Sequence, residues 1–127
     1  MDQHKHHEEL VKGIGEQMKS VLEKSPQAIY LYLDDNHKVC NRKFAELLGY
    51  TSPKDWADLD APLADVVEED QQAVIEAYMN ASEKMVADAI NVRMKNVKTG
   101  KIVKTRMIIA PVGHASHIFT AHFFSKI

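Results

Sequence analysis

The first stretch of the chain has the hydrophobic spacing of an amphipathic helix. Over residues 5–24 the apolar side chains recur mostly three or four positions apart and form one stripe: Leu10, Ile14, Met18, Val21 and Leu22. This spacing predicts a helix with glutamate and lysine on its opposite face. Ser25-Pro26 ends it, because the residue before a proline disfavours helical backbone. The stripe needs cover, either from the rest of the chain or from a second copy.

The middle of the chain alternates short strand-like and helix-like segments. Residues 27–33 are rich in isoleucine, tyrosine and leucine and predict a strand. A polar turn at 34–37 and a short strand at 38–41 follow. Residues 42–48 have helical spacing, and Gly49 can end that helix. Ser52-Pro53 is typical of a helix start, and residues 68–83 predict a longer helix.

After residue 85 the hydrophobic period changes from 3.6 to 2. Ile90, Val92 and Met94 alternate with polar residues, and similar alternation recurs over 103–109 and 117–124. Residues 98–101 (KTGK) predict a hairpin turn, and residues 111–116 predict a loop. The order predicts an α+β fold: about five antiparallel strands with helices on one face. The N-terminal helix is then available to cover the other face.

Several of these joints resemble the PAS domain family. The resemblance is clearest in the run from an asparagine to a Gly-Tyr pair: Asn41, Phe44, Leu47, Leu48, Gly49 and Tyr50. Residues 28–34 (AIYLYLD) look like the first PAS strand, and 63–70 (LADVVEED) like the stretch before the long helix. SPKDW at 52–56 and KTGK at 98–101 are similar to a PAS helix start and hairpin. The resemblance implies a PAS-like domain over residues 25–127, with residues 1–24 as a helical extension.

In ligand-binding PAS domains, the space between sheet and helices is the pocket. The resemblance therefore makes nine residues candidates for a pocket here: Leu31, Phe44, Leu48, Tyr78, Met94, Met107, Ile109, Phe119 and Phe123. Methionine and aromatic side chains adapt readily to a small guest. A filled core with no guest is the alternative.

The resemblance implies a stand-alone sensory or interaction module of signal transduction, not an enzyme. We expect no attached output domain, so the signal would pass in trans to a partner protein in the cytoplasm. We also expect a homodimer formed through the N-terminal helix and the sheet, in which the apolar stripe is paired across a two-fold axis. Its interface would comprise Leu10, Ile14, Met18, Val21 and Leu22.

A second hypothesis is a sensor that binds a flavin or haem cofactor, but few residues in the sequence support it. Flavin-binding relatives carry their adduct cysteine well after the Gly-Tyr pair, whereas Cys40 precedes it. A haem would need an axial imidazole, and residues 68–83 contain no histidine. His122, near the end of the chain, could point inward. We therefore expect the domain to bind neither flavin nor haem. Binding of an unidentified small ligand remains an alternative.

Histidines cluster at the start of the chain, at His4, His6 and His7. Such a cluster can bind a metal ion, but no cysteine or patterned aspartate completes a site in the sequence. We therefore expect a solvated tail and no metal. A third hypothesis is a small enzyme with His122 or Tyr78 in an internal pocket. The sequence contains no glycine-rich phosphate loop, nucleophile elbow or HExxH pattern to support it.

Composition narrows the partners further. The chain has 127 residues, 45% hydrophobic and 27% charged, as in a single globular domain. A net charge of −2 gives no reason to expect nucleic acid or an anionic membrane as partner. The longest apolar runs are six residues, whereas a membrane span needs about 20. One cysteine fits a reducing cytoplasm.

Overall fold

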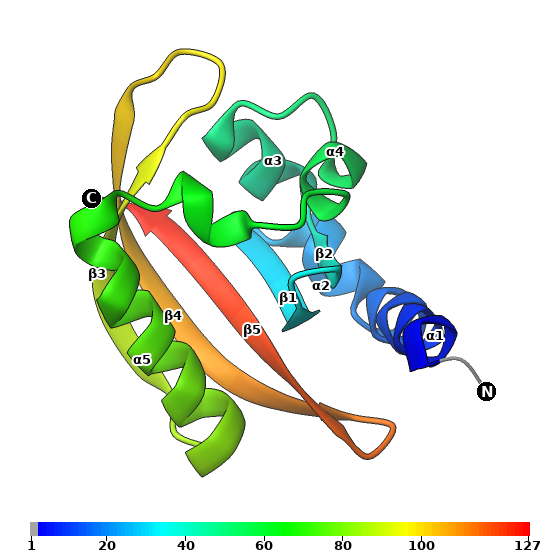
Figure 1. Cartoon of the computed structure of the whole chain (residues 1–127). Helices are drawn as coiled ribbons and strands as arrows, with labels where there is room; N and C mark the ends of the chain where they lie inside the picture. The colour runs from blue at the N-terminus through cyan, green and yellow to red at the C-terminus, as the bar shows by residue number, and fades with distance from the viewer. Residues whose placement is uncertain (1–2) are drawn as a thin grey trace.

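A five-stranded antiparallel sheet organises the computed structural model, which describes residues 3–127 (Figure 1). Residues 1–2 of the predicted extension lie outside the described residues. The strand order is β2-β1-β5-β4-β3. The strands are β1 (Ala28–Asp34), β2 (His37–Cys40), β3 (Asp88–Lys95), β4 (Ile102–His114) and β5 (His117–Lys126). The predicted α+β fold with five antiparallel strands is confirmed.

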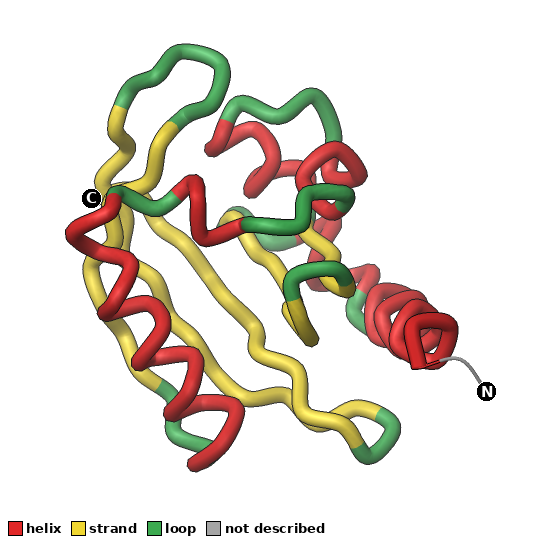
Figure 2. The backbone as a smooth tube through the Cα atoms, viewed as in Figure 1, coloured by secondary structure: helices red, strands yellow, loops and turns green. Residues whose placement is uncertain are grey.

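Helices cover both faces of this sheet. One face, which we call the inner face, carries α3 (Arg42–Leu48), α4 (Pro53–Ala57), the 3-10 helix η1 (Pro62–Asp65) and α5 (Glu68–Lys84) (Figure 2). The N-terminal helices α1 (Gln3–Gln17) and α2 (Lys19–Lys24) pack on the outer face, beside β1 and β2. Successive side chains of a strand point to opposite faces, so the sheet separates two hydrophobic cores.

The apolar stripe of the N-terminal segment is already covered by its own chain. Leu10, Ile14 and Leu22 are buried against outer-face residues of the sheet such as Leu31 and Phe119. Met18 is half-buried and separates α1 from α2, so the predicted continuous helix is in fact two; Val21 is exposed. Leu10, Ile14 and Leu22 are therefore not available to a second copy in this structure, and the homodimer itself stays a prediction.

The joints that carry the PAS resemblance form as the sequence predicts. Asn41 caps α3, its side-chain oxygen accepting a hydrogen bond from the Phe44 amide at 3.0 Å. Gly49 ends α3 with φ +82°, where a Cβ atom would lie only 2.4 Å from the Asn96 side-chain oxygen. Glycine is needed at this position for both reasons. Ser52 caps α4 as expected.

The predicted loop over residues 111–116 is wrong. β4 continues to His114, which pairs with His117 of β5, and a two-residue turn joins the strands. Both turn residues, Ala115 (φ 49°) and Ser116 (φ 64°), are left-handed. This matches the twist of a hairpin, but neither residue type signals it. Among the described residues no helix is both long and apolar enough to cross a bilayer.

Candidate functional site

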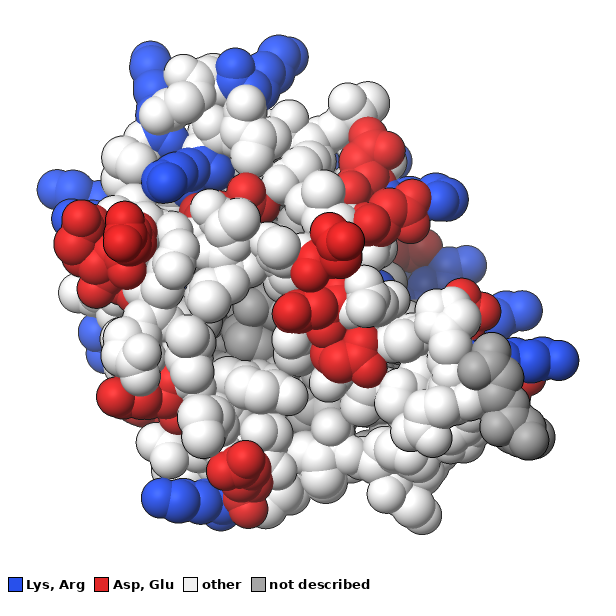
Figure 3. Space-filling model, in the orientation of Figure 1, with Lys and Arg blue, Asp and Glu red and all other residues white. Residues whose placement is uncertain are grey.

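A cavity of about 240 Å³ lies between the inner face of the sheet and the covering helices. It reaches the surface, because its lining includes the exposed Asp35 and the half-buried Tyr32, Ile75 and Tyr78. Figure 3 shows a hollow on this face of the molecule. The remaining lining residues come from every inner-face element except β2: Tyr30, Phe44, Trp56, Pro62, Leu63, Val66, Val74, Val92, Met94, Met107, His122 and Phe124.

The sequence predicted part of this lining. Of the nine candidates, four line the cavity: Phe44, Tyr78, Met94 and Met107. Leu48 and Ile109 are buried in the same core without lining it. Three candidates are wrong, because they lie on the outer face beneath the N-terminal helices: Leu31, Phe119 and Phe123. Beside Leu31 and Phe123 the strand neighbours one position away line the cavity instead, as the two-residue period of a strand requires.

Several of the missed lining residues carry rings: Tyr30, Tyr32, Trp56, His122 and Phe124. Tyr30 and His122 are directly opposite each other on β1 and β5, and their rings stack at 3.9 Å with planes 16° apart. Trp56 lies 4.9 Å from Tyr30 and 5.1 Å from Phe44, measured between ring centroids. The expectation that His122 points inward is confirmed. Trp56 could have been found as the sole tryptophan, just inside a capped helix start.

Two buried polar atoms of the lining residues have no hydrogen-bond partner among the described residues: Trp56 Nε1 and His122 Nδ1. The side chains are 0% and 2% exposed. His122 uses only its other nitrogen, which lies 2.9 Å from the Thr120 hydroxyl. Buried polar groups in native proteins almost always have a partner. Both atoms are closed off from solvent in this structure, so a molecule in the cavity reaches them only when the surrounding side chains shift.

The titratable side chains deep in the cavity are held uncharged. Burial lowers the pKa of His122 to about 3, so the ring is neutral near pH 7. Burial also raises the pKa of Tyr30 well above its usual range. At the mouth, Tyr32 donates a 2.5 Å hydrogen bond to Asp35, and burial together with this bond raises the pKa of Tyr32. The interior therefore offers dipoles and ring faces, not charges.

The rim of the cavity is acidic. Lys38 is buried beside it, 5.1 Å from the Trp56 ring centroid, and donates hydrogen bonds to the backbone oxygens of Asp35, Ala57 and Leu59. Burial lowers the pKa of Lys38, and four neighbouring carboxylates oppose that shift: Asp35, Asp60, Asp34 and Asp58. Acidic side chains gather beside the hollow in Figure 3. This excess of negative charge disfavours an anionic ligand.

The cavity lining does not match an adduct-forming flavin site. Cys40, the single cysteine, does not line the cavity, and its Sγ lies 3.8 Å from the Pro53 carbonyl oxygen. Burial raises the pKa of its thiol to about 12, so it stays protonated and unreactive. The long helix α5 contains no histidine that could face a haem. His122 is the one histidine that lines the cavity among the described residues.

Solved structures with the same arrangement are PAS domains. The chain is similar to the PAS domain of a two-component sensor histidine kinase (TM-score 0.67, 13% identity, 91% of this chain and 98% of that chain). It is also similar to the Rhodobacter sphaeroides LOV protein (TM-score 0.71, 16% identity, 91% and 68% covered). A third similar structure is the Vibrio cholerae VqmA dimer (TM-score 0.68, 12% identity, 87% and 50% covered).

The similarity to these proteins lies in the fold, because their sequence identity to this chain is low. No protein-family model matches the sequence, and no curated protein matches it significantly. The fold is that of a PAS domain, because solved PAS domains match about nine tenths of this chain at TM-scores of 0.65 to 0.68. The resemblance inferred from the joints along the sequence is thereby confirmed.

Proposed function

We propose that the protein is a non-catalytic sensory module that binds a small molecule in its internal cavity. The observation that carries this proposal is the pair of unpartnered polar atoms, Trp56 Nε1 and His122 Nδ1, on residues that line an otherwise apolar and aromatic space. Its similarity to PAS domains of signalling proteins supports a role in signal transduction. The free thiol of Cys40 fits the reducing cytoplasm.

The size and polarity of the cavity limit the ligand. An apolar cavity of about 150 Å³ can hold benzene, so a cavity of about 240 Å³ has room for one aromatic ring with small substituents. The Trp56 indole can only donate a hydrogen bond, so the ligand needs an acceptor. The acidic rim favours a neutral or cationic molecule. A neutral single-ring compound with a hydroxyl group fits all three conditions.

Phenol is therefore a suitable probe, and benzoate is its anionic counterpart. In an NMR titration of the full chain, we expect phenol to shift the amide signals of Tyr30, Met107 and His122 in a saturable way. Benzoate should bind at least about tenfold more weakly, because about 1.4 kcal/mol of charge repulsion is enough for that ratio.

A cavity-filling substitution provides the control. Val74 lines the cavity from α5, so Val74→Phe should abolish the phenol shifts. Val21→Phe introduces the same side chain at an exposed position outside the cavity and should leave them unchanged. Phenol shifts that persist in Val74→Phe, or that occur only at the surface, would contradict binding in the cavity.

We propose further that the module acts on a partner protein and forms a homodimer through the outer face of β3 and β4. The N-terminal helices reach β4 only at its far end, where Val112 packs in the outer core, and they leave Ile102 and Ile108 49% and 45% exposed on this face. Ile108 pairs with the half-buried Phe123 of β5, which extends the apolar surface. One similar structure is described as a dimer.

Light scattering at high micromolar concentration tests the dimer. We expect a mass of twice the 14.4 kDa chain, and we expect Ile108→Glu to reduce it to the single-chain value. Met79→Glu changes an equally exposed residue on α5, on the other side of the sheet, and should keep the dimer. Wild-type protein with the mass of one chain at that concentration would refute this part of the proposal.

A further inference from the structure

Histidines from distant parts of the chain meet at the end of the sheet. His7 of α1 lies between His37 of β2 and His117 of β5, with ring centroids 5.2 and 6.3 Å away. His6 packs against His117 at 5.2 Å. The expectation of a solvated tail is therefore wrong for the described residues: α1 begins at Gln3, and its first turns pack on the hairpin of β1 and β2. Asp34, at the end of β1, supplies the acidic residue that was not apparent from sequence spacing.

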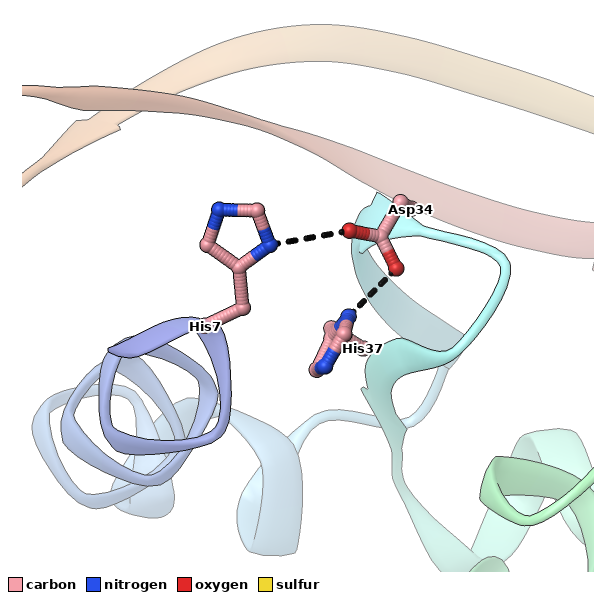
Figure 4. Close-up of side chains that lie close together, drawn as sticks. All are labelled: His7, Asp34 and His37. Carbon is pink, nitrogen blue, oxygen red and sulfur yellow. Dashed lines mark hydrogen bonds and ion pairs between the residues drawn. The ribbon is translucent and has the colours of Figure 1, made fainter. Parts of the chain in front are cut away.

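Asp34 bridges two of these histidines (Figure 4). One carboxylate oxygen lies 2.6 Å from His37 Nδ1, and the other lies 3.2 Å from His7 Nδ1. The three ligand atoms all lie within 4.8 Å of one another. His37 is buried, and His7 and Asp34 are partly buried.

His37 stands in a row of three short contacts. They join Asp34 Oδ1 to His37 Nδ1 (2.6 Å), His37 Nε2 to His4 Nδ1 (2.8 Å), and His4 Nε2 to Glu8 Oε1 (2.7 Å). All three separations are within hydrogen-bonding range.

A metal cation beside Asp34 is compatible with this row of contacts. With a cation on His37 Nδ1, His37 Nε2 can donate to His4, and His4 Nε2 can donate to Glu8. Metal-binding histidines usually donate their second ring N–H to a partner in this way, which fixes the ring orientation. Here the row of contacts already has that form.

We propose that His7, Asp34 and His37 bind a divalent transition-metal ion such as Zn²⁺. Imidazole nitrogens and a carboxylate oxygen are ordinary zinc ligands at about 2.0 to 2.2 Å, which places neighbouring ligand atoms about 3.4 Å apart in a tetrahedral site. The observed separations of 2.6 and 3.2 Å from Asp34 are within about 1 Å of that value. Three protein ligands leave a fourth position for water or another donor.

This site would tie the N-terminal helix to the mouth of the cavity. His7 belongs to α1, whereas Asp34 and His37 flank the turn between β1 and β2. Asp35 in that turn lines the cavity. Metal binding would therefore hold α1 against the sheet edge next to the ligand entrance. The inference rests on this side-chain cluster and does not depend on ligand binding in the cavity.

Calorimetric titration of the metal-free full chain with Zn²⁺ tests the proposal. We expect one ion per chain. His7→Ala and Asp34→Asn should each weaken binding by at least about tenfold, because even the loss of a residue that only orients a ligand costs about 10- to 100-fold. His6→Ala is the matched control: it removes a histidine from the adjacent position of the same helix, outside the three ligands, and should change affinity less than about threefold.

Two further measurements distinguish loss of zinc binding from loss of folding and identify the ligands. Circular dichroism melts without metal establish that each variant folds, and Zn²⁺ should raise the melting temperature of the wild type and His6→Ala but not of His7→Ala. NMR of the histidine rings should show Zn²⁺ shifts at His7 and His37. If His6→Ala abolishes binding while His7→Ala does not, the ion belongs to the His6–His117 pair and the proposed ligand set is wrong. If no Zn²⁺ binds stoichiometrically, the proposal fails.

Discussion

Replacing Asn41 with alanine should lower the free energy of unfolding by about 3 kcal/mol. The Asn41 side chain is 4% exposed and makes four hydrogen bonds to backbone groups. Its oxygen accepts from the amides of Ile29 and Phe44, and its nitrogen donates to the carbonyls of Leu22 and Gln27, all at 2.9 to 3.1 Å. Alanine would remove a helix cap and leave buried backbone groups without partners, each of which costs about 1 to 3 kcal/mol.

Asn41→Asp distinguishes the contribution of the accepting side-chain oxygen from that of the donating side-chain nitrogen. Aspartate keeps the acceptor for Ile29 and Phe44 but turns a second oxygen toward the carbonyls of Leu22 and Gln27. We expect a loss similar to that of alanine at pH 7, and a smaller loss in acid, where a protonated carboxyl can again donate one hydrogen bond. Urea unfolding at two pH values measures both variants. A loss below about 1 kcal/mol for Asn41→Ala would contradict this account of the joint, because that is the scale of one cap alone.

The second large effect is the pH dependence conferred by His122. Burial lowers its pKa to about 3 in the folded protein, whereas an unfolded histidine has a pKa of about 6.5. Between these values the unfolded chain binds a proton that the folded chain excludes. The contribution of neutral His122 to the free energy of unfolding is therefore fully present above about pH 6.5, and it is lost as the pH falls toward 3. The loss approaches about 1.4 kcal/mol per pH unit, or about 2 kcal/mol at pH 5.

Comparison with His122→Phe isolates this contribution. Phenylalanine keeps a ring opposite Tyr30 and carries no titratable or unpartnered nitrogen. Urea unfolding at pH 7 and pH 5 should show a wild-type loss larger than that of the variant by about 2 kcal/mol. Other titrating groups, such as Asp65, are present in both proteins and cancel in the difference. Equal pH dependence in the two proteins would mean that the ring is protonated in the folded state.

The joints between elements were predictable because each depends on a few adjacent residues. Asn41 and Gly49 need only a cap and a left-handed residue, and these local requirements are visible in the sequence. The change of hydrophobic period after residue 85 likewise predicted the three long strands β3, β4 and β5. The tight hairpin at Ala115 and Ser116 was missed because its left-handed residues are of unremarkable type. Pairing with β5 stabilises it instead.

The site was predictable only in part, because both cores of the sheet are hydrophobic. Leu31 and Phe119 are as apolar as true lining residues, and only strand register assigns them to the outer face. The polar character of Tyr30 and His122 was a usable signal for the face that bears a cavity. The cluster of His7, Asp34 and His37 joins segments about 27 to 30 positions apart. No spacing rule covers such a set, because tertiary packing alone brings α1 to the β1–β2 turn.

The central claim is that the space over the inner face of the sheet receives a small molecule. Its most direct test is the signal of the His122 ring nitrogens during the phenol titration. We predict a saturable shift at Nδ1 that is absent in Val74→Phe and retained in Val21→Phe. A His122 ring that does not respond at saturating phenol would contradict the claim, because the cavity would then be closed to the class of ligand it fits best.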